Sequence, residues 1–79
     1  MLNFDLYAIH TTDSEYHGSI KEYFISFEDA MNNRMKYADW WCPKGRVTIK
    51  KFSANSSMTY ASESWDIHED GRIIKHHKW

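Results

Sequence analysis

The chain has 79 residues, with ten Lys/Arg against eleven Asp/Glu and a formal charge of −1. This balance excludes both the basic surplus typical of nucleic-acid-binding proteins and the acidic surplus of a DNA mimic. The length predicts one domain over residues 1–79, and the single cysteine excludes an intrachain disulfide, so packing of the four Trp, five Tyr and four Phe must supply stability.

Two strands are expected before the first helix. Apolar and polar residues alternate near the N-terminus, which is the period of a half-buried strand over about residues 2–10. The polar run at 11–18 predicts a loop or a loose hairpin connection, and residues 20–25 (IKEYFI) predict a second, shorter strand. The pattern leaves open whether these strands are neighbours. The apolar positions of the first strand are Leu2, Phe4, Leu6 and Ala8.

The hydrophobic period becomes helical after Ser26. Ser26 and Asp29 form a near-capping box, in which the serine hydroxyl accepts a backbone N–H and the acid favours the positive end of the helix dipole. Apolar spacings of three and four then predict an amphipathic helix over about residues 27–41. Pro43 disfavours the α conformation at the residue before it and ends the helix. The expected core positions are Phe27, Ala30, Met31, Met35, Ala38 and Trp41.

Residues 46–52 (RVTIKKF) predict a third strand with Val47 and Ile49 on its inner face. In this register Phe52 falls on the outer face, so either the strand ends there or a bulge resets the alternation.

Residues 63–79 predict a C-terminal hairpin. Asp70-Gly71 is the dipeptide that a two-residue type I′ turn prefers, because both central residues need φ > 0. A turn at this place sets three acids opposite three bases, which favours the register. The expected couples are Glu69–Arg72, Asp66–Lys75 and Glu63–Lys78. The register also predicts that Trp65, Ile67 and Ile74 lie under the helix, with Trp65 opposite His76 and Ile73 on the other face.

The order strand, strand, helix, strand, strand, strand predicts an α+β two-layer sandwich. One amphipathic helix packs on a mainly antiparallel sheet of four to five strands.

No constellation of residues points to catalysis, a cofactor or a metal. Cys42 follows the C-terminal end of the predicted helix, where the helix dipole does not lower a thiol pKa. Capping explains Glu28 and Asp29. His76 and His77 point to opposite faces of a strand, which argues against joint chelation. We therefore expect a non-enzymatic protein without a cofactor.

The aromatic residues are the best lead to function. Trp40 and Tyr37 flank the helical stripe, Trp79 ends the hairpin, and Tyr16 lies in an acidic loop. A domain this small seldom buries four Trp, and Trp and Tyr are enriched at interface hot spots. These four residues are predicted to contact a protein partner; the alternative is that they wrap the rim of a thin core.

A second hypothesis is nucleic-acid binding by the basic strand over residues 44–51. Lysines and arginine beside an aromatic residue are typical of surfaces that track phosphates and stack bases. The alternative for these residues is a solvated strand edge, where lysines discourage aggregation. The residues concerned are Lys44, Arg46, Lys50, Lys51 and Tyr60.

The strand–strand–helix–strand–strand order, with the segment 24–30 (FISFEDA) leading from strand into capped helix, resembles small accessory proteins of bacteriophages and prophages. The resemblance implies a non-enzymatic protein made in an infected or lysogenic bacterium. Such a protein acts as an inhibitor or adaptor by binding a host protein, including CRISPR–Cas and other defence components. The resemblance carries no site residue.

The N-terminus (MLNFDLYAIH) has no signal-peptide pattern, and no apolar stretch approaches the length of a transmembrane helix. We therefore expect a soluble protein in the bacterial cytoplasm that does not associate with membranes. Pairing of a sheet edge beside Trp79 with a second copy is left open, so a homodimer is one candidate assembly.

Overall fold

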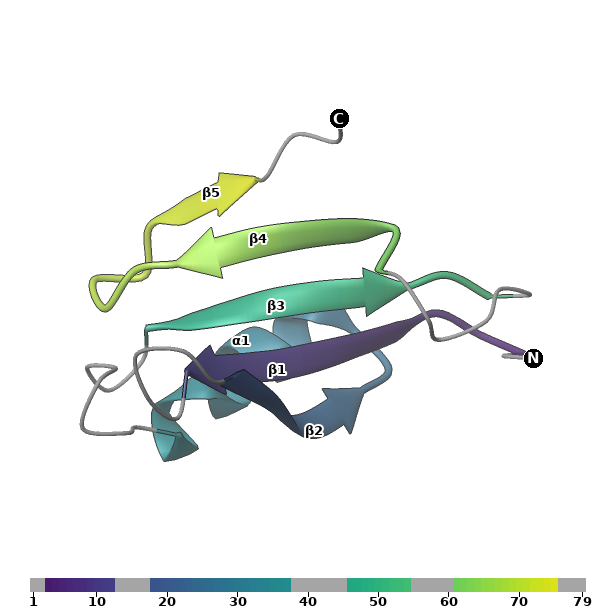
Figure 1. Ribbon diagram of the computed structural model, residues 1–79, viewed down its shortest axis with the longest axis horizontal. Helices are drawn as coiled ribbons and strands as arrows, with labels where there is room; N and C mark the ends of the chain where they lie inside the picture. The colour runs from purple at the N-terminus through teal and green to yellow at the C-terminus, as the bar shows by residue number, and fades with distance from the viewer. Residues whose placement is uncertain (1–2, 13–17, 38–45, 55–60, 76–79) are drawn as a thin grey trace.

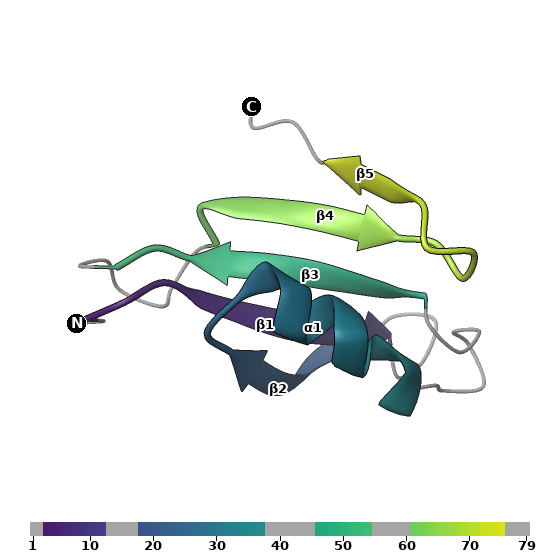
Figure 2. The same ribbon diagram turned by 180° about the vertical axis from the view of Figure 1, so that it is seen from behind.

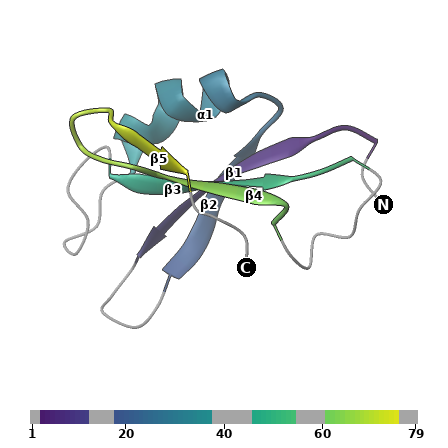
Figure 3. The same ribbon diagram turned by 90° about the horizontal axis from the view of Figure 1, so that it is seen from above.

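The computed structural model describes residues 3–12, 18–37, 46–54 and 61–75. Five strands form one antiparallel sheet in the order β2-β1-β3-β4-β5 (Figure 1). The strands are β1 (Leu6–Thr12), β2 (Gly18–Phe24), β3 (Val47–Phe52), β4 (Glu63–Ile67) and β5 (Ile73–Lys75). Helix α1 (Phe27–Asn33) lies on one face of the sheet, here called the helix face (Figure 3). The predicted α+β two-layer sandwich is confirmed, and β1 and β2 are neighbours.

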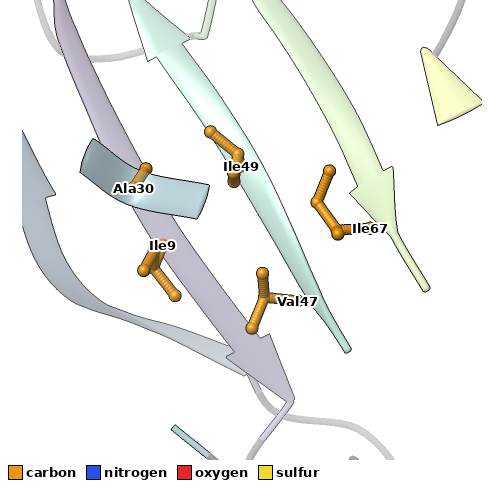
Figure 4. Close-up of a cluster of buried hydrophobic side chains, with 5 residues drawn as sticks. All are labelled: Ile9, Ala30, Val47, Ile49 and Ile67. Carbon is orange, nitrogen blue, oxygen red and sulfur yellow. The ribbon is translucent and has the colours of Figure 1, made fainter. Parts of the chain in front are cut away.

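Five residues form the centre of the core between α1 and the sheet. They come from four elements and are at most 4% exposed (Figure 4). Ala30 is the contribution of the helix, and its small side chain lets α1 approach the sheet closely. Ile9 and Val47 lie below it with the other two isoleucines, so the prediction that Val47 and Ile49 face inward is confirmed. The five residues are Ile9, Ala30, Val47, Ile49 and Ile67.

The first strand begins later than expected. The residues of this strand that face the helix are Tyr7 and Ile9, not the predicted alternate residues Leu6 and Ala8. β1 starts at Leu6, whereas Phe4 lies before the strand and is 54% exposed. Tyr7 and Ile9 point toward the helix because these larger side chains fill the space beneath it, while Ala8 is buried on the opposite face. Leu2 lies outside the described residues. The second strand begins two residues before the expected 20–25 and ends one residue before it, which leaves Ile25 outside the strand and 70% exposed.

The helix begins where the capping residues predict it and ends earlier. Ser26 is the N-cap, and its Oγ accepts a hydrogen bond from the Asp29 N–H at 3.0 Å. The α-helix stops at Asn33, a 3₁₀ turn continues over Arg34–Lys36, and Tyr37 is extended.

Local hydrogen bonds explain the early helix end. The Asn33 side-chain amide donates to the Asp29 carbonyl, and the Arg34 guanidinium donates to the Met31 carbonyl, so side chains occupy acceptors in the last turn. The prediction of a helix to residue 41 is therefore wrong. Met35 is 43% exposed and does not belong to the core as expected. Ala38 and Trp41 lie outside the described residues.

The third strand ends at Phe52, as one of the two alternatives expects. Phe52 still pairs with Leu6 of β1, and no bulge resets the alternation between β3 and β1. Phe52 is 4% exposed on the face opposite the helix, where its ring lies 6.4 Å from that of Tyr23. An apolar position on the expected outer face is thus buried, because this end of the sheet has apolar contacts on both faces.

The hairpin forms at the predicted place in a register shifted by one residue. The Gly71 N–H donates to the His68 carbonyl, so Glu69 and Asp70 are the central residues of the turn, and Gly71 follows with φ +91°. This is a three-residue loop with a glycine bulge rather than the predicted two-residue type I′ turn. The observed pairs are Trp65–Lys75, Asp66–Ile74 and Ile67–Ile73.

The change of register overturns two of the predicted charge couples, Glu69–Arg72 and Asp66–Lys75, and reverses the faces of β5. Asp66 accepts a hydrogen bond from the Thr48 hydroxyl at 2.9 Å, and Lys75 instead lies 3.2 Å from Glu63. Ile73, not Ile74, shares the helix face with Trp65. The expected Glu69–Arg72 couple and the expected burial of Ile74 are therefore both wrong. His76 and Lys78 lie outside the described residues.

Candidate functional site

The helix leaves part of its own face of the sheet uncovered. Figure 2 shows α1 over the β1 side of the sheet, with β4 and β5 extending beyond it. Beside the helix, a hollow of about 290 Å³ opens to solvent. It is called the aromatic hollow here, and its lining comes from four elements: Tyr7 (β1), Phe27 (α1), Glu63 and Trp65 (β4) and Ile73 (β5).

Three of the residues that line the aromatic hollow are aromatic. The Phe27 and Trp65 rings meet edge to face, with centroids 4.9 Å apart, and Tyr7 lies 6.2 Å from Phe27 and 6.4 Å from Trp65. Offset and edge-to-face pairs of this kind add to the stability of the contact and fix the ring orientations. At the rim, Ile73 is 48% exposed. The lining of the hollow is thus mainly apolar, with Ile73 half-exposed to solvent.

Two lysines and a carboxylate set the charge at the rim. Glu63 holds Lys75 at 3.2 Å and Lys51 at 3.9 Å, and Lys51 also lies 3.6 Å from Asp5. The Lys75 and Lys51 ammonium groups stand 6.0 Å and 5.9 Å from the Trp65 and Tyr7 ring centroids, within cation–π range. The two Glu63 carboxylate oxygens thus face different lysines, Oε1 facing Lys75 and Oε2 facing Lys51.

The pKa of Lys51 is raised above its usual value, chiefly by the electrostatic interaction with Tyr7 and then by Asp5 and Glu63, against the effect of desolvation. The amine therefore stays charged at neutral pH. Its ion pairs are partly exposed and contribute little to stability.

Of the residues predicted to contact a protein, the described ranges include Tyr37. Its ring packs against the core, and its hydroxyl donates a hydrogen bond to the Glu22 carboxylate on β2. This bond, together with burial and the negative charge of Glu22, raises the pKa of Tyr37. Tyr37 thus ties the end of the 3₁₀ turn to the sheet. Trp40, Trp79 and Tyr16 lie outside the described residues.

The described residues of the predicted basic surface do not lie together on one face of the sheet. Lys50 and Lys51 are successive residues of β3 and therefore point to opposite faces of the sheet. Lys51 is engaged by two carboxylates on the helix face, while Arg46 is exposed just before the strand. Lys44 and Tyr60 lie outside the described residues.

Sequence reasoning missed the aromatic hollow because it rests on the hairpin register. With β5 shifted by one residue, Ile73 joins Trp65 on the helix face, in the part of that face that α1 leaves uncovered (Figure 2). A signal for this register was present: Asp70-Gly71 after His68-Glu69 also suits a type I turn followed by a glycine in the left-handed conformation.

Within residues 3–12, 18–37, 46–54 and 61–75, no three His, Cys, Asp or Glu side chains are grouped to hold a metal ion. None of the helices in these ranges is long and apolar enough to cross a membrane. Comparisons of the chain with protein-family models, with curated proteins and with solved structures find no match.

Proposed function

We propose that the chain is a non-enzymatic protein-binding module that holds its partner at the aromatic hollow. The observation that carries this proposal is the meeting of three rings from three elements beside a half-exposed Ile73. Aromatic anchors in a preformed concavity, surrounded by charged groups, are the usual make-up of an interface hot spot. An apolar side chain of the partner would fill the hollow, and polar groups would meet Lys75 and Glu63 at its rim.

The resemblance to accessory proteins of bacteriophages and prophages suggests the class of partner. In a bacterial host, the module would act as an inhibitor or adaptor of a host protein, such as a CRISPR–Cas or other defence component. Such an activity needs surface complementarity and no catalytic group, which agrees with a lining whose one carboxylate is held by lysines.

Two isoleucines of β5 provide a matched test. Ile73 and Ile74 are each 48% exposed and adjacent in one strand, but they lie on opposite faces, and Ile73 alone lines the hollow. The tagged chain and the Ile73→Asp and Ile74→Asp variants would be immobilised at low density and used to capture proteins from bacterial lysate. Captured proteins would be identified by mass spectrometry.

We expect Ile73→Asp to lose a protein that both the unmodified chain and Ile74→Asp retain. Circular dichroism would establish that both variants fold. Equal capture by the two variants would overturn the aromatic hollow as the binding surface. Retention of single-stranded DNA or RNA at low salt, with an affinity that falls steeply as salt increases, would instead support the nucleic-acid alternative.

A further inference from the structure

The outer edge of β5 ends the sheet and carries two half-exposed isoleucines. Within the described residues, β5 has β4 on one side and no strand on the other. Ile73 and Ile74 are each 48% exposed, on opposite faces, and Lys75 follows on the helix face. An uncovered edge with apolar side chains is a template for pairing with another strand.

The hydrogen-bond pattern of the hairpin shows which backbone groups face outward. The His68 N–H donates to the Arg72 carbonyl at 2.9 Å, so His68–Arg72 is a hydrogen-bonded pair. Bonded and non-bonded pairs alternate along an antiparallel ladder. The backbone groups of Ile74 therefore point toward β4, and those of Ile73 and Lys75 point away from the sheet.

We propose that β5 pairs antiparallel with β5 of a second copy of this chain, across a two-fold axis at Ile74. This centre pairs each residue of the strand with a residue of the other copy: Ile74 with its own counterpart and Ile73 with the partner's Lys75. The outward backbone groups of Ile73 then meet those of the partner's Lys75, which is the bonded pair that the ladder requires.

Charge favours a second copy in this register. Each Lys75 faces an isoleucine, on which its aliphatic stem packs, so no like charges stand directly opposed. An axis at Lys75 would set the two lysines against each other, and an axis at Ile73 would leave Lys75 outside the pairing with β5. Each Lys75 also keeps its own Glu63, 3.2 Å away.

The two-fold axis stands perpendicular to the sheet, because antiparallel partners related by symmetry share their faces. Both helices, and both aromatic hollows, would then lie on one side of the continuous sheet. The partner's Lys75 would lie beside Ile73 at the rim of each hollow. Since a three-residue strand buries little surface, we expect a reversible dimer of the transient class.

Cysteine cross-linking gives a geometric test. In a Cys42→Ser background, Ile74→Cys would place two thiols in a non-bonded pair, with Cα atoms about 4.5 Å apart, inside the range that a disulfide spans. Ile73→Cys is the matched control: it has equal exposure, but the two copies of residue 73 are diagonal neighbours about 7–8 Å apart. We expect mild oxidation to link Ile74→Cys into a dimer and to leave Ile73→Cys monomeric.

Sedimentation equilibrium gives a second, non-covalent measurement. The mass of the unmodified chain should rise with concentration from 9.5 kDa toward twice that value, while Ile74→Asp, which sets like charges on the axis, should stay monomeric. Equal cross-linking of both cysteine variants, or a monomer up to millimolar concentration, would overturn the proposal. Protein capture at low density does not depend on this edge, so either proposal can fail without the other.

Discussion

At the residue scale, Tyr37 shows how one side chain joins two layers. Its hydroxyl donates to Glu22 on β2, and its ring packs on the core, so the chain leaves the 3₁₀ turn held against the sheet. The hydrogen bond uses the protonated phenol. This is why the bond to Glu22 raises the pKa of Tyr37 above 10.0.

Replacement of Tyr37 by Phe should therefore remove a pH-dependent contribution to stability. Because the folded-state pKa exceeds the unfolded value, the contribution is fully present below pH 10.0 and is lost as the pH rises through the folded pKa. We expect Tyr37→Phe to lower the free energy of unfolding at pH 7 by roughly 1 kcal/mol, and the difference from the unmodified chain to shrink above pH 10. Urea unfolding over this pH range measures both effects.

Tyr23→Phe serves as the control, since Tyr23 is 45% exposed on the face opposite the helix. We expect its stability to stay within about 0.5 kcal/mol of the unmodified chain at each pH. A difference for Tyr37→Phe that is absent at pH 7, or constant with pH, would contradict the role assigned to this bond.

At the element scale, the hairpin shows how a single residue in a turn sets the faces of a strand. A two-residue turn and a three-residue turn with a glycine bulge both suit Asp70-Gly71. They differ by one residue in register, and because side chains alternate, that difference exchanges Ile73 and Ile74 between the faces. The opposed charges favoured the wrong register because surface ion pairs contribute little to stability and therefore do not decide between two turns that the same dipeptide allows.

Proton NMR can decide the register directly. In the observed hairpin, Trp65–Lys75 and Ile67–Ile73 are the non-bonded pairs, whose Cα atoms approach to about 4.5 Å. We expect strong Hα–Hα cross-peaks for these two pairs. A cross-peak between the Hα protons of His68 and Ile73, which form a non-bonded pair in the two-residue turn, would instead support that turn and would remove Ile73 from the aromatic hollow.

At the scale of the whole molecule, the core is thin and the helix covers only part of one face of the sheet. A chain of 79 residues buries a smaller share of its surface than a larger domain does, so the few fully buried side chains carry much of the stability. α1 lies over the β1 side of the sheet (Figure 2), and the aromatic hollow opens beside it, where the helix does not cover β4 and β5. The same small core that limits stability thus leaves apolar side chains such as Ile73 half-exposed.

Loss of one methyl group from the core should be measurable. Ile49 is fully buried at the centre of β3, and we expect Ile49→Val to lower the free energy of unfolding by about 0.5–1.5 kcal/mol. Ile74→Val is the control, because Ile74 is 48% exposed, and we expect a change within about 0.5 kcal/mol. Urea midpoints of the two variants give the comparison; equal loss in both would contradict the assignment of the core to the helix face.

Sequence patterns that extend over a few residues located the elements of secondary structure. Alternation located β3, the Ser26 hydroxyl located the start of α1, and Asp70-Gly71 located the hairpin, because each signal acts within a few residues of the chain. From these elements the α+β two-layer class follows, and so do Ala30, Val47 and Ile49 as core residues. The helix end was missed because Asn33 and Arg34 bond back onto the helix, which apolar spacing does not reveal.

The sequence by itself thus determined the kinds of elements, their order and much of the buried set. Only the tertiary structure decided the strand order, the register of β5 and the extent of cover by α1. These depend on contacts between residues far apart in the chain, such as Phe27 with Trp65 and Tyr7 with Lys51. Contacts of this kind form the aromatic hollow. A pattern along the chain therefore indicates that aromatic residues are available, but it does not indicate where their rings meet.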